Sequence, residues 1–357
     1  MKPRVATGLY SHWDSVVKVD KKVVDWIKNS KKTKPSDKID SLSKAVFTIE
    51  QAMKAGGREF LITEKVYKEL DEIFPKRKMM LGGNGNNMGR MLFSLGFNPL
   101  VSYPQRPKKL MKASPKFRIA LGKKIVTPEK ATRDDPEYQH IIFEFENDRH
   151  ILTWNPAESK GVFDNDFLDF ACNKKFTDLL ILAYAHLLLP DYKKRTDIII
   201  EKMGKKRPKV HLEFGTGSKP SMKYAMNQFS ERGCCDSFGL NEKECRIYFK
   251  AQSEKLQDLV EACKNAVKEY NVERICVHNP YFVFSISKYN PDKELEALKQ
   301  AYFITTGFKD KKNIHESKEK TGKYNICLLK TKIDPSPKTP IGLGDKFSSI
   351  QAVRTLL

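Results

Sequence analysis

The second half of this chain alternates short apolar runs with amphipathic segments, and this alternation restricts the fold more than any other feature. Runs typical of buried strands lie at 179–182, 210–214, 275–277 and 324–329. Apolar residues at helical spacing lie at 191–203, 221–230, 256–270 and 294–302. Strands that alternate with amphipathic helices predict a mostly parallel α/β sheet with helices on both faces. In such sheets, ligands bind beyond the carboxyl ends of the strands.

The first half of the chain is less regular. Strand patterns lie at 5–10, 100–103, 119–126 and 140–145, and helical patterns lie at 40–55 and 63–73. Several short strands among helices predict a second, smaller sheet rather than further βαβ units. With 357 residues and 40% hydrophobic content, the chain can bury a large core, most simply as one large domain carrying a smaller one.

The composition argues against several classes of partner. The net charge of +21 is carried by Lys/Arg clusters with few interleaved aromatic residues, so we expect solvated loops and no nucleic-acid partner. The same charge would raise the local concentration of anionic ligands. No apolar run reaches membrane-spanning length and the N-terminus has no signal-peptide core, which predicts a cytoplasmic protein without membrane contact. The seven cysteines are scattered, form no C-x-x-C pair, and are expected to be reduced.

A glycine-rich turn near the C-terminus runs directly into a helical pattern. The stretch 339–353 contains Gly342 and Gly344, followed by apolar residues at helical spacing. The unpaired N–H groups and positive dipole end of a helix N-terminus form an anion site, which glycines let a phosphate approach closely. Asp345 would then take a proton from a hydroxyl that attacks the phosphate. The alternative is that Asp345 is only an N-cap and that the glycines only shape a turn.

Two pairs of polar residues follow strand patterns in the second half. His211 and Glu213 lie on one face of a strand, and Asn241 and Glu244 share a face at a predicted helix start. The two carboxylates would hold a water-rich magnesium ion, which prefers a few oxygen ligands plus substrate phosphates. The alternatives are that His211 is a core histidine and Glu244 a solvated helix residue. His278 ends another strand pattern, and it has the same two interpretations as His211: a site residue or a core histidine.

Two further candidates lie in the first half. Asp14 follows the first strand pattern, where it would accept a hydrogen bond from a substrate hydroxyl; the alternative is a turn or N-cap aspartate. Gly83 and Asn84 belong to a Gly/Asn-rich turn that opens a helix. Such a turn again favours a close approach of a ligand to the backbone.

Taken in chain order, the motifs of this sequence resemble those of the archaeal-type ADP-dependent sugar kinases, the glucokinase and phosphofructokinase family of the ribokinase superfamily. The resemblance extends nearly end to end. It rests on residues 8–14, 82–84, 103–105, 142–145, 147–151, 211–213, 241–244, 277–278, 342–345 and 348–349. It implies a ribokinase-like α/β domain with a mostly parallel central sheet, a smaller α+β lid domain, a magnesium cofactor, and ADP rather than ATP as the phosphate donor.

The resemblance also implies a role for each matching residue. Asp345 would be the catalytic base, with Gly342 and Gly344 in the anion hole. Glu213 and Glu244 would organise magnesium and its waters. The remaining residues would bind the two substrates: the sugar at Asp14, Gly83, Asn84, Glu144 and Arg149, and the nucleotide at Asn241, His278 and Leu343.

The two implied domains are interleaved along the chain. Residues 1–14, 74–105 and 158–357 would form the large nucleotide-binding domain. Residues 15–73 and 106–157 would form the lid, which would close over the substrate and exclude water.

The chain departs from the family pattern mainly on the acceptor side. Ser11, His12 and Trp13 stand where an asparagine-rich turn is usual, and Lys346 follows the aspartate where a small polar residue is commoner. Trp13 offers a flat face for a ring and His12 a donor for a phosphate, unless Trp13 simply packs between the domains. We therefore expect transfer of the β-phosphate of ADP to a sugar or sugar phosphate, of the glucose or fructose 6-phosphate type, with release of AMP. A nucleoside or other polyol as acceptor, or a binding protein without turnover, are the alternatives.

Overall fold

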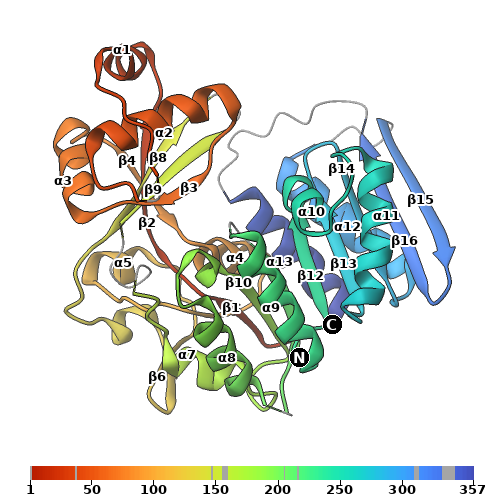
Figure 1. Ribbon diagram of the computed structural model, residues 1–357. Helices are drawn as coiled ribbons and strands as arrows, with labels where there is room; N and C mark the ends of the chain where they lie inside the picture. The colour runs from red at the N-terminus through yellow and green to blue at the C-terminus, as the bar shows by residue number, and fades with distance from the viewer. Residues whose placement is uncertain are drawn as a thin grey trace.

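The computed structural model describes residues 2–36, 38–145, 148–154, 160–204, 206–214, 217–308, 313–331 and 342–357. Within these residues the chain forms a nine-stranded sheet, a five-stranded sheet and a two-stranded ribbon (Figure 1). Asn147 and the start of the C-terminal turn, Thr339 to Ile341, lie outside the described residues. No described helix is both long enough and apolar enough to cross a membrane.

The nine-stranded sheet has the order β15-β16-β14-β13-β12-β11-β10-β1-β5. The strands from β13 to β5 are parallel, and β14, β16 and β15 add an antiparallel edge. Their bounds are β1 (Val5–Gly8), β5 (Leu100–Val101), β10 (Leu179–Tyr184), β11 (Lys209–Phe214), β12 (Ser237–Asn241), β13 (Arg274–His278), β14 (Phe282–Ser287), β15 (Ile314–Thr321) and β16 (Tyr324–Thr331). The predicted mostly parallel α/β sheet is confirmed. The alternation did not reveal β14 as a separate strand, because it follows β13 without an intervening helix.

Helices cover both faces of this sheet, which explains the continuous apolar runs of its central strands. In β10, Leu180 and Leu182 pack with one set of helices, whereas Leu179 and Ile181 pack with the other. The first set is α7 (Asn165–Ala171), α8 (Tyr192–Met203), α9 (Lys219–Glu231), α10 (Glu242–Tyr248) and α11 (Leu256–Glu269). The second set is α4 (Asn84–Ser94), α12 (Pro291–Thr306) and α13 (Leu343–Leu356). The catalytic candidate Asp345 is thus carried by a helix packed against α4 and α12.

The five-stranded sheet has the order β3-β9-β8-β2-β4 and stands apart from the larger sheet (Figure 1). Its strands are β2 (His12–Lys18), β3 (Glu59–Leu61), β4 (Lys78–Gly82), β8 (Gln139–Glu144) and β9 (Arg149–Thr153). Three helices bury one face: α1 (Lys21–Asn29), α2 (Leu42–Ala55) and α3 (Glu64–Ile73). The opposite face presents His12, Asp14, His140 and Arg149 to a cavity. Only residues 9–11 separate β1 from β2, so the chain passes directly from one sheet to the other.

Sheet membership and packing differ from the predicted domain ranges in two places. β4 lies in the range 74–105 expected for the large domain, yet it pairs with β2 in the five-stranded sheet. Residues 106–131, expected in the lid, form α5 (Lys108–Ala113), β6 (Ile119–Leu121), β7 (Lys124–Val126) and η1 (Pro128–Ala131). Phe117 and Ile119 pack with Val101 of β5, at the edge of the large sheet. The same cluster of apolar residues is also contacted by Trp13 of β2 and Leu81 of β4, so this segment packs against both sheets.

Candidate active site

A cavity of about 440 Å³ lies between the carboxyl ends of the central strands, the N-terminus of α13 and the open face of the five-stranded sheet. Most of the predicted site residues line it: Asp14, Gly83, Asn84, Arg149, Glu213, Asn241, Glu244, His278, Gly342, Gly344 and Asp345. Glu144 and Leu343 do not. Glu144 is the last residue of β8, two residues beyond Ile142, which lines the cavity. In the sheet it pairs with Arg149 of β9. Leu343 belongs to the same turn as its neighbours but is not part of the cavity wall.

The turn before α13 has the geometry of an anion site. Gly342 is the N-cap and adopts a left-handed conformation, with φ of +69°. A Cβ at this position would come within 2.9 Å of Asn87 Nδ2, so both the backbone and the space require glycine. The Lys346 N–H donates to the Gly342 carbonyl at 3.1 Å, and the preceding N–H groups of the first turn have no partner within the helix. These groups and the helix dipole favour an anion at this wall of the cavity.

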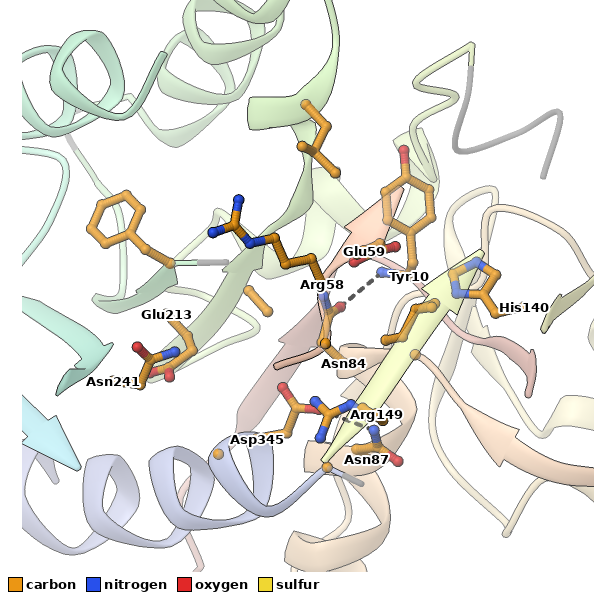
Figure 2. Close-up of a pocket in the computed structure, with 18 of the residues that line it drawn as sticks. Tyr10, Arg58, Glu59, Asn84, Asn87, His140, Arg149, Glu213, Asn241 and Asp345 are labelled. Atoms are coloured by element: carbon orange, nitrogen blue, oxygen red, sulfur yellow. Dashed lines mark hydrogen bonds between the residues drawn. The ribbon is translucent and has the colours of Figure 1, made fainter. Parts of the chain in front are cut away.

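Asp345 is the third residue of α13 and is not its N-cap, so the N-cap alternative is wrong. Its Oδ2 accepts a hydrogen bond of 3.0 Å from Asn87 Nδ2. Burial raises the pKa of Asp345, the Asn87 hydrogen bond opposes this, and the nearby Glu213 carboxylate raises the pKa further. In Figure 2, Asp345 stands at the start of its helix with Asn87 and Arg149 beside it. A carboxyl group with a raised pKa at an anion site is suited to accept a proton there.

Glu213 lies at the end of β11, where its carboxylate passes over the neighbouring strand. A Cβ on Gly239 of β12 would come within 1.9 Å of Glu213 Oε2, so only glycine leaves room for it. Ser348 of α13 donates a hydrogen bond of 2.6 Å to the same oxygen. Burial raises the pKa of Glu213. His278 Nε2 lies 3.8 Å from Oε1, on the other side of the carboxylate.

His211 is buried beside Glu213, and both of its ring nitrogens have polar neighbours. Nδ1 lies 2.9 Å from Ser237 Oγ. Nε2 lies 3.2 Å from Gln351 Nε2 and 3.4 Å from Glu213 Oε2. Burial lowers the pKa of His211 to about 3, which keeps the ring neutral. His211 is therefore a core histidine, as one interpretation expected, and it lies in contact with the Glu213 carboxylate.

Asn241 and Glu244 form a capping box at the start of α10. Asn241 Oδ1 accepts from the Glu244 N–H at 2.8 Å, and Glu244 Oε2 accepts from the Asn241 N–H at 2.9 Å. The alternative that Glu244 is a solvated helix residue is wrong, because its carboxylate is bound to the backbone in this box and the residue is only partly exposed. Burial raises the pKa of the carboxyl to about 8. The spacing that suggested a metal site is thus also that of a capping box, which leaves Oε1 as the carboxylate oxygen outside the box.

Asp14 lies within β2 rather than in a turn, which corrects its predicted place after a strand. A Cβ on Gly82, in the paired strand β4, would come within 2.1 Å of the carboxylate, so glycine provides its space. His12 Nε2 lies 3.2 Å from Asp14 Oδ1. Because side chains alternate along a strand, Trp13 faces the other way and packs with Leu81 against the cluster around Val101. The packing interpretation of Trp13 is correct, and Trp13 does not line the cavity.

The second glycine turn connects the two sheets. Gly83 has φ of +80°, and a Cβ there would come within 2.6 Å of the Tyr10 carbonyl oxygen. Asn84 Oδ1 accepts hydrogen bonds from the Tyr10 and Gly85 N–H groups, the first of which is drawn in Figure 2. These bonds tie the start of α4 to the segment between β1 and β2. Asn84 therefore shapes the cavity with its side-chain oxygen.

Several cavity residues were not predicted: Tyr10, Arg58, Glu59, Asn87, His140, Asp148 and Lys243. Asn87 had a usable signal, because it lies one helical turn beyond Asn84 in the same Gly/Asn-rich segment. Arg58 and Lys243 had none, since isolated basic residues are common in a chain with 65 Lys and Arg. His140 reaches the cavity only through the pairing of β8 with β2.

A parallel sheet with an anion-binding helix N-terminus, facing buried carboxylates beneath a second sheet, is typical of a small-molecule kinase of the α/β type. The model of the ADP-specific phosphofructokinase/glucokinase conserved region matches residues 3–309. The chain belongs to this family. It is an ADP-dependent sugar kinase, a phosphotransferase whose acceptor is a hydroxyl group.

Solved structures show the same fold at low sequence identity. A hypothetical ADP-dependent phosphofructokinase from Pyrococcus horikoshii OT3 has a TM-score of 0.73 and 16% identity, over 99% of this chain and 97% of that chain. An ADP-dependent kinase in complex with fructose-6-phosphate and ADPβS has a TM-score of 0.78 and 15% identity, over 99% and 94%. An adenosine kinase from Sinorhizobium meliloti has a TM-score of 0.50 and 11% identity, over 80% and 77%. No curated protein matches the sequence.

Proposed function

We propose that this enzyme transfers the β-phosphate of ADP to a hydroxyl of a sugar phosphate of the fructose 6-phosphate type, and releases AMP. A free sugar of the glucose type is the second candidate acceptor. The observation that carries the proposal is the position of Asp345, held by Asn87 at the anion-binding start of α13. A base and a set of N–H donors at one point of a cavity are what phosphoryl transfer to a hydroxyl requires.

In this mechanism the chain supplies a base and an anion hole. The acceptor hydroxyl gives its proton to a carboxylate oxygen of Asp345 as its oxygen forms a bond to the β-phosphorus. The bond between the β-phosphorus and the bridging oxygen breaks, and that oxygen leaves with AMP. The N–H groups of the turn at Gly342 and Gly344 donate to the oxygens of the transferred group. Asn87 holds Asp345 in the orientation that this step needs.

The carboxylates of the site fit a magnesium ion. Burial raises the pKa of both Glu213 and Glu244, and no Lys or Arg among the described residues forms an ion pair with either. A cation is therefore the missing counter-charge of this wall. The described carboxylates of Glu213, Glu244 and Asp345 do not form a group of ligand atoms within 4.8 Å, which favours binding through waters. When bound, magnesium neutralises phosphate charge on the donor.

A phosphorylated acceptor is supported by basic residues on the lid side. Arg58 and Arg149 line the cavity on the side of the five-stranded sheet, and Lys243 lines it from α10. The transferred phosphate would bind at the turn that begins with Gly342. The three basic side chains would therefore bind a second phosphate group, that of the acceptor. Asp14 would accept a hydrogen bond from a sugar hydroxyl, whereas a neutral nucleoside would offer these cations no phosphate to bind. Asn241 and His278 are proposed to bind the nucleotide.

The test is a screen of glucose, fructose 6-phosphate and adenosine with ADP or ATP, in which AMP and ADP are both measured. We expect AMP to form with ADP and fructose 6-phosphate, and little product with ATP. The Asp345→Asn variant, purified in the same way, controls for contaminating kinases. Turnover of glucose or adenosine alone would overturn the phosphorylated acceptor. Binding of ADP without turnover of any acceptor would instead indicate a binding protein.

A further inference from the structure

The acceptor wall contains a group of three potential metal ligands, of which the proposed phosphotransfer uses only Asp14. One ligand atom each from His12, Asp14 and His140 lies within 4.8 Å of the other two. His12 and Asp14 are two residues apart on one face of β2, and His140 of β8 pairs with Asp14 in the parallel register. The arrangement follows from this register, because the three side chains leave one face of the sheet at adjacent positions.

The three side chains are more than nine-tenths buried, with exposed fractions of 7%, 4% and 4%. His12 Nε2 lies 3.2 Å from Asp14 Oδ1, but His12 Nδ1 is buried without a partner among the described residues. A buried nitrogen without a partner is costly, and a ligand bound to this Nδ1 would remove the cost. The rings of His12 and His140 are in contact, with centroids 3.6 Å apart.

We propose that His12, Asp14 and His140 bind one divalent transition-metal ion of the zinc or cobalt class. Two imidazoles and one carboxylate form a ligand set that suits these ions, whereas magnesium prefers oxygen ligands and belongs with Glu213 and Glu244. All three residues line the cavity, from which water would complete the coordination of the ion. The two rings are tilted by 33° and must turn further apart about their soft terminal torsions to direct both nitrogens at one ion.

Such an ion would inhibit the kinase by competing with the acceptor. Asp14 cannot ligate a metal and accept a hydrogen bond from the sugar in the same way, so bound metal should raise the acceptor KM. This second part depends on the proposed function, because it assumes that Asp14 binds the acceptor. Metal binding itself does not depend on that function and can be measured without substrates.

The first experiment titrates the full-length protein with cobalt alone and follows the visible absorption of the bound ion. We expect one equivalent to bind with nitrogen and oxygen ligands, and zinc to displace it. Affinity should fall by roughly 10-fold or more in His12→Gln and in His140→Gln. The seven cysteines are buried free thiols, and cobalt bound to them would be recognised by strong thiolate charge-transfer bands.

The matched control is His315→Gln, which removes an exposed histidine on β15 of the other sheet. Circular dichroism and thermal unfolding without metal identify any variant that fails to fold, and Asp14→Asn supplies a third variant of nearly the same shape. Unchanged binding in folded variants of His12 and His140, an equal loss in the His315 variant, or no saturable binding would overturn the site. If cobalt binds but zinc leaves the acceptor KM unchanged, the competition is refuted.

Discussion

The cavity has two walls, and they are built on different principles. The donor wall combines the ends of β11 to β13 with the N-terminus of α13, and it carries Glu213, Glu244 and Asp345. The acceptor wall is the open face of the five-stranded sheet, and it carries Asp14, His140 and Arg149. On the donor wall the topology itself gathers polar groups, since the carboxyl ends of parallel strands meet at one edge. On the acceptor wall the groups project from within strands, and only strand pairing brings them together.

The two walls also differ in how tightly their side chains are fixed. Glu213 is held by the Ser348 hydroxyl and has the space above Gly239. Asp14 has the space at Gly82 and a contact with His12, but His12 itself retains a buried nitrogen without a described partner. The donor wall also has a buried nitrogen without a described partner, His278 Nδ1, so the difference between the walls lies in the hydrogen bond that Ser348 donates to Glu213.

The largest expected effect is on the donor wall. Asp345→Asn should lower kcat by about 10² to 10⁴ and leave ADP binding nearly intact, because the amide cannot accept the acceptor's proton. Single-turnover kinetics and ADP titration measure the two quantities. Asp292→Asn, in the exposed first turn of α12, is the matched control and should leave both unchanged. Normal turnover in a folded Asp345→Asn protein would remove Asp345 from the mechanism.

A second substitution on the same wall tests the metal. Glu213→Gln removes one negative charge from the proposed magnesium site while keeping its size. We expect the magnesium concentration for half-maximal activity to rise by roughly 10- to 100-fold. Glu244→Gln should act in the same direction. If both variants needed the same magnesium as the parent enzyme, the assignment of these carboxylates would be wrong.

On the acceptor wall, Asp14→Ala should raise the acceptor KM and lower kcat/KM by roughly 10- to 100-fold, because a charged hydrogen bond to a substrate hydroxyl is lost. The apparent affinity for ADP should stay nearly constant, since the change lies on the other side of the transferred phosphate. Steady-state kinetics with each substrate varied in turn separates the two effects. A loss confined to the affinity for ADP would place Asp14 on the donor wall and contradict the division of the cavity into a donor wall and an acceptor wall.

The support of Glu213 can be tested with two neighbouring serines on α13. Ser348 donates to Glu213 Oε2 at 2.6 Å, whereas Ser349 donates to the carbonyl of Lys346 at 2.8 Å. Both are buried, so their alanine variants lose the same group in similar surroundings. We expect Ser348→Ala to raise the magnesium requirement about 10-fold and Ser349→Ala to leave it unchanged. Equal magnesium curves would show that the Ser348 bond does not position the carboxylate.

The contrast between the donor wall and the acceptor wall also explains which site residues the sequence could predict. Glu213, Asn241 and Asp345 were found because each lies at the end of a strand pattern or at the start of a helix pattern. The topology of a parallel sheet then brings these positions to one edge. His140 was not found, because its position beside Asp14 depends on which strands pair and in which register. The packing of residues 106–131 could not be predicted from their position in the chain, because their apolar side chains contact Val101 of the large sheet and also Trp13 and Leu81 of the smaller one.

The last and smallest effect concerns stability and uses Glu244 of the donor wall. Its pKa is raised from 4.5 to about 8, so an unfolded chain loses this proton near pH 4.5 and the folded chain near pH 8. Between these values the folded state binds more protons, and stability falls as the pH rises.

Glu244→Gln keeps an oxygen for the capping box and removes the titration. We therefore expect the variant to gain roughly 1–3 kcal/mol over the parent at pH 8, and little at pH 4. Urea unfolding at several pH values without magnesium measures the gain. Glu64→Gln, in the exposed first turn of α3, is the control and should show no such dependence. A parent and a Glu244→Gln variant with parallel pH profiles would mean that Glu244 is already ionised in the folded protein, and that this wall needs no cation to hold its charge.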